Sequence, residues 1–339
     1  MNTVTSQILP LEKWQRELAR GMRNTNELLK ILDISPRELP EVDHNAAFPL
    51  RVPLSYVARM NKGDPNDPLL RQILPLVCEQ QDAPDFSRDP VGDLSAMIMP
   101  GLMRKYKGRV LLVTTGACAI HCRYCFRRHF PYSETHPDTD QWHDIVDYLA
   151  KDTSLEEVIL SGGDPLTLSN RNLSSLTGRL ADLTHLERLR IHTRLPVVLP
   201  ARVDDGLMQW LGRIPFKTVM VIHANHPNEI DNDVPNVLHK LSQAGITLLN
   251  QTVLLRGIND DSSTLVRLSK ALFEANVIPY YLHILDRVQG AAHFEVEERQ
   301  ARQLYQELLS ELPGYLVPRL VREQTGSPFK QPLQCPDTG

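Results

Sequence analysis

Three cysteines lie close together in the first half of the chain, at Cys118, Cys122 and Cys125, with the spacing C-x3-C-x2-C. Three thiolates at this spacing can bind three irons of a cubane [4Fe–4S] cluster and leave the fourth iron without a protein ligand. An open position on a metal is a place where a small molecule can bind and react, as at catalytic zinc sites. The spacing therefore predicts a reactive iron–sulfur centre.

Other uses of these cysteines compete with the cluster. A disulfide would require an oxidising compartment, and residues 1–22 carry charged side chains without the apolar run of a secretory signal. A zinc site could take His121 or His129 as its fourth ligand, but the spacing differs from the usual paired CxxC pattern. Free cysteines are often buried for packing alone, yet they seldom cluster. The remaining cysteines, Cys78 and Cys335, lie far from the motif and are expected to be free thiols.

A second group of small and acidic residues, Ser-Gly-Gly-Asp-Pro-Leu at 161–166, follows an apolar run. Glycine lets a backbone approach a ligand closely, and the Asp164 carboxylate could accept a hydrogen bond from an ammonium group. Taken alone, this stretch is equally typical of a turn. Its position after the cysteine motif favours a ligand-binding loop.

The composition is that of an ordinary globular protein, with 339 residues of which 42% are hydrophobic and 23% charged. This length suits one large domain with an extension, or two domains. The net charge of −4 offers no broad basic field for nucleic acid. No stretch approaches the roughly 18 apolar residues of a membrane span. We therefore expect a cytoplasmic protein with no nucleic-acid or membrane partner.

Alternating strands and helices are expected from residue 105 to residue 312. Apolar, β-rich runs recur at 110–114, 157–160, 188–192, 218–222, 246–254 and 278–285. Helical patterns lie between and after them, at 141–151, 172–183, 204–211, 234–244, 263–275 and 296–312. Such alternation predicts an α/β fold of parallel βαβ units, and six of them suit an open, partial (β/α)6 barrel. Functional loops of such barrels follow the C-terminal ends of strands, where both motifs fall.

Residues 1–104 have a different character and are expected to form a helical N-terminal extension. Helical periodicity covers 14–22 and 25–32, and proline-rich connections follow. Asn24 or Thr25 is the expected cap of the second helix. Nothing in the pattern of these helices decides whether they associate with a second copy of the chain, so a homo-oligomer remains open.

The C-terminal segment, 313–339, begins with an apolar run at 315–321 and is otherwise polar. A segment this short is expected either to remain disordered or to fold over the mouth of the barrel.

Together the motifs resemble those of the radical S-adenosylmethionine (SAM) enzymes and, more narrowly, of the lysine 2,3-aminomutases. The similarity extends over about residues 68–330. The segments that carry it are 106–109, 118–128, 161–165, 194–200, 223–229, 250–255 and 279–286. The resemblance implies a radical SAM barrel and an isomerase that uses a [4Fe–4S] cluster, SAM and pyridoxal 5′-phosphate (PLP).

The resemblance implies which residues bind the cluster and SAM. The cluster ligands would be Cys118, Cys122 and Cys125, and the loop that contacts SAM would contribute Gly162, Gly163 and Asp164. SAM would chelate the open iron. One electron from a low-potential donor such as flavodoxin or ferredoxin would then cleave SAM to methionine and a 5′-deoxyadenosyl radical.

The resemblance also places PLP. Lys330 matches the lysine that holds PLP as a Schiff base, although its loop lacks the family's run of glycines. By sequence alone it is typical of an exposed tail lysine. Lys105, Tyr106 and Arg109 match the phosphate-contacting segment, and His223 matches a residue beside the cofactor. Lys105 replaces a family arginine, which keeps the charge but loses the bidentate fork. Without the resemblance, Tyr106 and Arg109 would suit an ordinary solvated strand start.

Three residues match the family's lysine-binding positions. Arg127 corresponds to the residue that binds the α-carboxylate, and a guanidinium suits a carboxylate by bidentate bonding. Asp286 and Glu323 correspond to the two acids that hold the distal ammonium. The family's lysine mutases carry aspartate at the position of Glu323. The longer side chain could move the distal amine by about one methylene and so affect product stereochemistry or the turnover of free lysine.

The resemblance thus implies a lysine 2,3-aminomutase that converts L-α-lysine to (R)-β-lysine for modification of elongation factor P, in functional connection with that factor and its lysyl-ligase. One rival is a PLP-dependent mutase for another amino acid such as glutamate, whose side chain Asp286 and Glu323 would repel. Other rivals are a radical SAM enzyme without PLP and a cluster- or zinc-binding regulatory protein without turnover.

Overall fold

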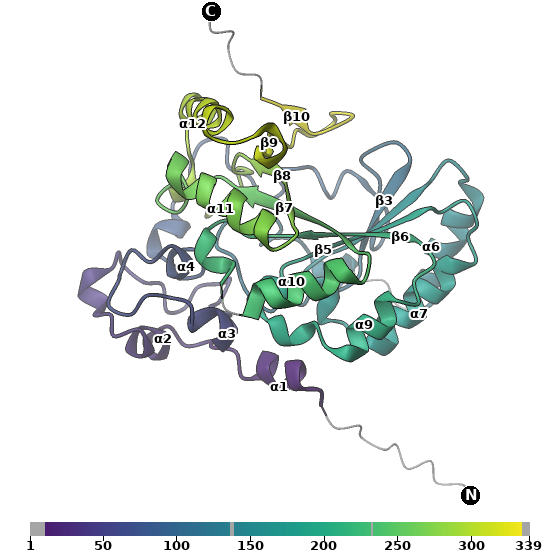
Figure 1. Ribbon diagram of the computed structural model, residues 1–339, viewed down its shortest axis with the longest axis horizontal. Coiled ribbons are helices and arrows are strands. Elements are labelled where there is room, and N and C mark those ends of the chain that lie inside the picture. The colour runs from purple at the N-terminus through teal and green to yellow at the C-terminus, as the bar shows by residue number, and fades with distance from the viewer. Residues whose placement is uncertain (1–10, 136–138, 232, 334–339) are drawn as a thin grey trace, which may run out of the picture.

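A single mixed sheet of ten strands forms the centre of the molecule, and its strands lie side by side in chain order from β1 to β10 (Figure 1). The computed structural model describes residues 11–135, 139–231 and 233–333. The parallel strands are β3 (Arg109–Val113), β4 (Glu157–Ser161), β5 (Arg188–Thr193), β6 (Lys217–Ile222), β7 (Thr247–Val253), β8 (Ile278–His283) and β9 (Arg319–Arg322). Short antiparallel strands complete both edges, namely β1 (Met97–Met99), β2 (Leu102–Met103) and β10 (Gln331–Pro332).

Helices connect the parallel strands and follow one another from right to left in Figure 1, from α6 to α12. They are α6 (Thr139–Lys151), α7 (Asn170–Ala181), α8 (Leu195–Val198), α9 (Asp205–Leu211), α10 (Asp233–Gln243), α11 (Ser262–Glu274) and α12 (Glu298–Glu311). Acidic and hydroxyl side chains cap several of them. Asp261, for example, accepts a hydrogen bond from the Thr264 backbone N–H at the start of α11. The partial barrel expected from the sequence is confirmed.

The six expected strands and the six expected core helices are all present, and their ends agree to within two residues. The C-terminal segment was expected either to remain disordered or to fold over the mouth of the barrel, and the first of these expectations is wrong for the part that the structure describes. Its described part, as far as Leu333, is ordered, because the run at 315–321 contains most of β9, which pairs in parallel with β8. The barrel therefore has a seventh parallel strand. Cys335, which was expected to be a free thiol, lies outside the described residues.

The N-terminal extension contains α1 (Lys13–Ala19), α2 (Thr25–Ile31), α3 (Leu54–Val57) and α4 (Pro68–Arg71). The Asn24 side chain caps α2, as expected, by accepting from the Glu27 backbone N–H. One continuous cluster of buried apolar side chains joins this extension to the barrel. At the contact, the Arg202 guanidinium lies 4.5 Å from the ring centroid of Trp14. The division into segments 1–104, 105–312 and 313–339 stays a prediction, although β1, β2, β9 and β10 belong to the same sheet as the core.

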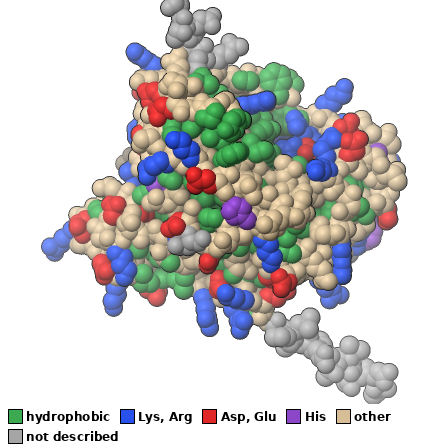
Figure 2. Space-filling model, in the orientation of Figure 1, with side chains coloured by type: hydrophobic (Ala, Val, Ile, Leu, Met, Phe, Trp, Pro, Cys, Tyr) green, Lys and Arg blue, Asp and Glu red, His purple; other side chains and the backbone are tan. Residues whose placement is uncertain are grey.

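Charged side chains of both signs are interspersed over the face shown in Figure 2, with a hydrophobic area in its upper part. The exposed large apolar side chains include Phe273 and Tyr315, whose rings lie 5.4 Å apart. Among the helices of the described residues, none is both long and apolar enough to cross a bilayer.

Candidate functional site

The residues expected to bind ligands gather at the edge of the sheet where the parallel strands end. The cysteine loop follows β3, the Gly-Gly-Asp-Pro loop follows β4, and Arg194 follows β5. The end of β8 leads to Asp286, and Glu323 directly follows β9. Neighbouring parallel strands end on the same side, so the fold brings these loops to one edge. Tyr106, in the segment before β3, reaches the same site, because its hydroxyl donates to Glu323.

The two glycines at 162 and 163 bring the loop after β4 directly against the backbone of the cysteine loop. The backbone N–H of Gly163 donates to the Thr115 carbonyl at 2.7 Å. A Cβ at Gly162, which has a φ of +119°, would lie 2.5 Å from the Thr115 oxygen, and one at Gly163 would lie 2.4 Å from the Ala117 oxygen. Only glycine permits this contact, so these two residues hold the two ligand-binding loops together.

Asp164 is engaged within the protein. Its Oδ1 accepts from the Leu166 N–H at 3.0 Å and from the Thr193 hydroxyl at 2.7 Å, and its Oδ2 accepts from the Arg194 N–H at 2.7 Å. Burial raises the pKa of this carboxyl to about 6, and these hydrogen bonds oppose the rise. In this structure the carboxylate ties the loop after β4 to the end of β5 and offers its oxygens to neighbouring protein groups.

The three cysteines of the motif are free thiols on a loop that is partly open to solvent. Burial raises the pKa of Cys118, and burial together with the charge of Cys122 raises the pKa of Cys125 to about 11. Thiolates at such a place need positive charge beside them, which iron supplies, so the loop fits a cluster. Among the described residues no three side chains of His, Cys, Asp or Glu converge as around one ion, but a cubane has each thiolate on a different iron.

The two histidines considered as zinc ligands have other contacts. His121 Nδ1 lies 2.8 Å from the Pro49 carbonyl oxygen, and its ring stacks on Phe48. His129 Nε2 lies 3.0 Å from the Gln289 carbonyl oxygen. Each contact uses one ring nitrogen and leaves the other, and metal-binding histidines commonly make such a carbonyl contact, so these contacts do not distinguish a zinc site from a cluster.

Lys330 lies in a compact group of polar side chains that come from the segment before β3 and from the segment after β9. Its ammonium donates to Glu323 Oε2 at 2.5 Å, and the Tyr106 hydroxyl donates to Glu323 Oε1 at 2.6 Å. Lys105 lies 3.9 Å from the same oxygen. Burial acts to raise the pKa of Glu323, but these three neighbours together bring it below its ordinary value. With 23% of its side chain exposed, Lys330 is not an exposed tail lysine.

Asp93, which sequence reasoning missed, connects this group to Arg127. Its Oδ1 lies 2.6 Å from Lys105 Nζ, and its Oδ2 accepts from Arg127 Nε at 2.6 Å. Arg127 also donates through Nη1 to the Ser161 hydroxyl at 2.9 Å. Both Asp93 and Arg127 line a cavity of about 230 Å³. No sequence motif marks Asp93, because it lies in the irregular connection before β1.

Some of the buried polar atoms without a protein partner in the described part of the chain belong to side chains of this site. They are Arg109 Nε, His192 Nε2 and both ring nitrogens of His283. Burial lowers the pKa of His192 and of His283, and the Lys330 charge contributes to both shifts. Orphaned polar atoms beside a lysine fit a polar cofactor that is held by that lysine, as PLP is.

The other residues expected at this site are also nearby. Arg109 lies with its guanidinium 4.8 Å from the Tyr106 ring centroid, and the His223 ring lies 5.8 Å from that of His192. Burial lowers the pKa of His223 to about 4. Burial raises the pKa of Asp286 to about 7; the Lys330 charge opposes this rise and the Glu323 charge adds to it. Asp286 is thus within electrostatic range of both.

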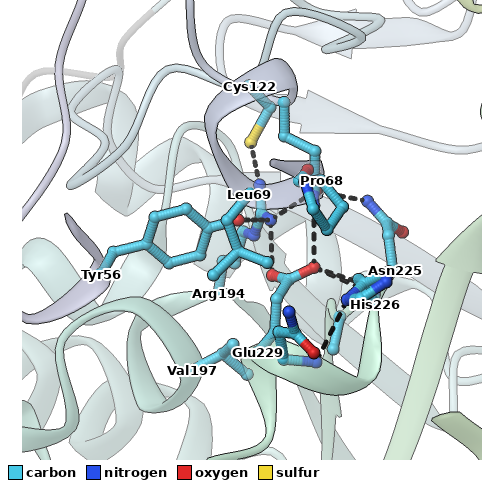
Figure 3. Close-up of polar contacts among 12 residues, drawn as sticks. Tyr56, Pro68, Leu69, Cys122, Arg194, Val197, Asn225, His226 and Glu229 are labelled. Atoms are coloured by element: carbon cyan, nitrogen blue, oxygen red, sulfur yellow. Dashed lines mark hydrogen bonds and ion pairs between the residues drawn. The ribbon is translucent and has the colours of Figure 1, made fainter. Parts of the chain in front are cut away.

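Arg194 is the centre of a buried network of polar contacts (Figure 3). The sequence analysis gave these residues no role, although the segments 194–200 and 223–229 are among those that carry the resemblance. Arg194 Nη1 donates to the Cys122 sulfur at 2.7 Å, and Nη2 donates to Glu229 at 2.7 Å. The same Nη2 lies within hydrogen-bonding distance of Gln72 and Tyr56. These contacts could be found only from the structure, because the partners come from four separate segments.

An open barrel of parallel strands with a three-cysteine loop after its first parallel strand defines a radical SAM protein. Residues 112–268 match the model of the radical SAM superfamily.

Curated relatives narrow this class. The chain is 47% identical over 324 residues to L-lysine 2,3-aminomutase of Escherichia coli K12, covering 95% of this chain and 94% of that protein. It is 44% identical to L-lysine 2,3-aminomutase of Buchnera aphidicola subsp. Baizongia pistaciae, with 94% of each chain covered. For the Haemophilus influenzae L-lysine 2,3-aminomutase the identity is 43%, with 94% and 95% covered. The chain therefore belongs to the lysine 2,3-aminomutase family. Membership implies a [4Fe–4S] cluster, SAM and PLP.

Proposed function

We propose that this protein converts L-α-lysine to (R)-β-lysine by moving the amino group from C2 to C3. The observation that carries this proposal is that Glu323 accepts from the Lys330 ammonium at the rim that also carries the cysteine loop, with a second acid, Asp286, near enough for the charges of both to affect its pKa. A substrate that carries an ammonium group at its far end fits such a site. The names of the relatives above support the 2,3-migration on L-lysine, while the (R) configuration of the product rests on the sequence resemblance alone.

The chain offers a distinct set of groups to each cofactor. We assign Cys118, Cys122 and Cys125 to the cluster, and the loop of Gly162, Gly163 and Asp164 to SAM. We assign Lys330, Lys105, Tyr106, Arg109 and His223 to PLP. When bound, the cluster and SAM supply a carbon radical, and PLP supplies the π-system that lets nitrogen migrate between adjacent carbons.

The contacts around Lys330 would allow its place beside Glu323 to be taken by the ammonium group of the substrate. In this structure its ammonium is held by Glu323, which also accepts from Tyr106. A lysine nitrogen must lose a proton before it can act as a nucleophile, and the Glu323 carboxylate is the nearest acceptor. Once Lys330 leaves this contact, Glu323 and Asp286 can accept the distal ammonium of the substrate. Arg127, held by Asp93, has its Nη2 free of partners among the described residues and is assigned to the α-carboxylate.

The same two acids argue against glutamate or another acidic amino acid as substrate. The side-chain carboxylate of such a substrate would lie beside the carboxylates of Glu323 and Asp286. Neighbouring negative charges repel one another in a half-buried site.

Several aspects of the cellular role also belong to this proposal. A one-electron donor of low potential, such as flavodoxin or ferredoxin, would reduce the cluster, and free thiols suit the reducing cytoplasm. The run at 122–131 resembles the corresponding run in enzymes that supply β-lysine for modification of elongation factor P. This resemblance would connect the chain to that factor and its lysyl-ligase. The enzyme could act as a homo-oligomer.

An anaerobic assay tests the function. We would reconstitute the protein with iron and sulfide, add SAM, PLP, dithionite and L-lysine, and separate the lysine isomers on a chiral column. (R)-β-lysine should appear with the unmodified protein and with Lys270→Ala, a control at an exposed lysine of α11. It should be lost in Cys122→Ala and Lys330→Ala. Formation of 5′-deoxyadenosine without β-lysine would overturn the substrate and leave the radical SAM assignment intact.

A further inference from the structure

Arg194 is a buried cation in direct contact with one cysteine of the motif. Its Nη1 donates to the Cys122 sulfur at 2.7 Å, and 7% of its side chain is exposed. Among the described residues, Cys122 is the cysteine of the motif whose sulfur accepts a side-chain hydrogen bond. A guanidinium carries its charge at any accessible pH, so this contact places a permanent positive charge beside that sulfur.

Glu229 balances this charge and fixes the orientation of the guanidinium. Its Oε2 accepts from Arg194 Nη2 at 2.7 Å. Its Oε1 accepts from the backbone N–H groups of Asn225 and His226 and from the Gln72 side chain. Glu229 has no exposed surface, so its charge is anchored by the turn Pro227–Glu229 and depends on Arg194 for neutralisation.

The network also connects the cysteine loop to two other parts of the molecule (Figure 3). Through its backbone N–H, Arg194 is tied to Asp164 of the loop after β4. Gln72 and Tyr56 come from the N-terminal extension and accept from Arg194 Nη2 at 2.9 and 3.3 Å. In addition, the backbone carbonyl of Gln72 accepts from the backbone N–H of Arg123, the residue after Cys122. The position of this one cysteine is thus set by three converging segments.

We propose that Arg194 is a positioning residue that holds Cys122 in place as a cluster ligand and raises the reduction potential of the cluster, while Glu229 limits the rise. The inference rests on the cluster that the proposed function requires. Hydrogen bonds and positive charge at a cluster sulfur stabilise the reduced state more than the oxidised state, because the reduced cluster carries one more negative charge.

Two substitutions should move the reduction potential in opposite directions. Arg194→Met removes the donor and the charge and should lower it. Glu229→Gln removes the balancing charge and should raise it. Arg194→Lys keeps the charge but not the fork, so its potential should lie between those of the unmodified protein and Arg194→Met. Each tenfold change in the relative affinity for the two oxidation states corresponds to about 59 mV for one electron.

The measurement is a redox titration of the reconstituted cluster followed by electron paramagnetic resonance, without SAM or lysine. Iron bound per chain is measured in parallel, and Arg194→Met should retain the cluster about 10- to 100-fold less tightly. Arg202→Met is the matched control. Arg202 is also a buried arginine, but it donates to the Leu166 carbonyl and to Asn170. Its loss should weaken folding and leave the potential unchanged.

The outcomes separate this inference from the proposed function. Opposite shifts for Arg194→Met and Glu229→Gln support it, because a merely structural role would not give two signs. Equal potentials in all variants overturn it, even if β-lysine is still formed. A changed SAM affinity with an unchanged potential also overturns it and makes Arg194 a SAM ligand. If Arg194→Met does not fold, Arg194→Lys and Glu229→Gln still decide. Failure of the unmodified protein to bind a cluster would instead refute the proposed function.

Discussion

The carboxylate of Glu323 serves two neighbours at once, Tyr106 and Lys330, through its two oxygens. A side chain with one methylene fewer cannot keep both contacts without moving the backbone that follows β9. This makes Glu323 the residue at which small changes in length should affect both the cofactor lysine and the substrate's distal ammonium.

Glu323→Asp should therefore lower kcat/KM for L-lysine by about 10- to 100-fold, since misplacement by roughly 1 Å has effects of this size. The ratio of (R)- to (S)-β-lysine should shift with it. Chiral chromatography and initial rates measure both quantities, with Glu311→Asp, at an exposed position, as control. An unchanged product ratio together with an unchanged KM would show that the length of this side chain does not matter.

The pH dependence should report Asp286. Burial raises its pKa to about 7, so in the free protein the group is protonated below this pH and ionised above it. Only the ionised form attracts an ammonium, so kcat/KM should fall as the pH is lowered from about 8 to about 6. Lys330, Glu323, Lys105 and Asp93 contribute to the same field.

Asp286→Asn is the variant that tests this assignment. Its kcat/KM should be lower than that of the unmodified protein above about pH 7, where Asp286 is ionised, and it should lose the decrease near pH 7. The check is a pH profile of kcat/KM for both proteins. The same inflection in Asp286→Asn would assign it to another group.

Sequence reasoning could select only residues that carry a motif, such as Cys122 and Lys330, whose roles stay predictions, and it missed residues that are defined only by contact. Asp93 has no motif, since its function depends on reaching both Lys105 and Arg127 in three dimensions. Asp164 was expected to face a ligand, but its oxygens accept hydrogen bonds from neighbouring protein groups. A sequence does not show which backbone N–H groups will donate to a given carboxylate, because this depends on the fold.

Among the elements, the contact between the loops after β3 and β4 is the most sensitive to substitution. A methyl group at Gly163 would lie 2.4 Å from the Ala117 carbonyl oxygen, and both partners are backbone. The two loops would have to separate.

Gly163→Ala should destabilise the fold by about 1 to 3 kcal/mol, a typical cost of overpacking. It should also weaken SAM binding and reduce the iron bound per chain. Gly178→Ala is the control, because this helical glycine has open space around it and its substitution should stabilise by about 0.5 to 1 kcal/mol. Urea unfolding, iron analysis and equilibrium dialysis of SAM measure the effects. Normal iron content and SAM affinity in Gly163→Ala would show that the loops can separate without harm.

The strands and long helices of the barrel could be predicted because each has a clear apolar period, and several of the helices, such as α11, also begin at a capping side chain. β9 was not expected as a strand. It has four residues, two of them arginines, and its pairing with β8 supplies what its own sequence does not. β10 is shorter still and contains a proline. Tertiary pairing decides such segments, and local propensity does not.

For the molecule as a whole, the N-terminal extension shares its core with the barrel. Arg59 of the extension donates to the backbone carbonyls of Glu229 and Val197, both at 2.6 Å. Trp14 packs under Arg202. These contacts cross the boundary between segments 1–104 and 105–312, so the two should unfold together.

The tryptophans provide the test. In a variant that keeps only Trp14, with Trp142 and Trp210 replaced by phenylalanine, the fluorescence and circular dichroism transitions in urea should coincide. The same should hold for a variant that keeps only Trp210. A Trp14 transition at clearly lower urea than the loss of helical signal would show that the extension unfolds independently.

The outer strands of the described sheet have a consequence for association between molecules. β1 and β10 have three and two residues, and β10 includes Pro332, which has no N–H to donate. Long, flat strand edges offer unpaired backbone groups on which other chains can add, leading to aggregation. The open barrel would be at risk of this, since it does not close on itself. Its two short edges leave few such groups, so growth of one sheet into that of a neighbouring molecule is disfavoured at both ends.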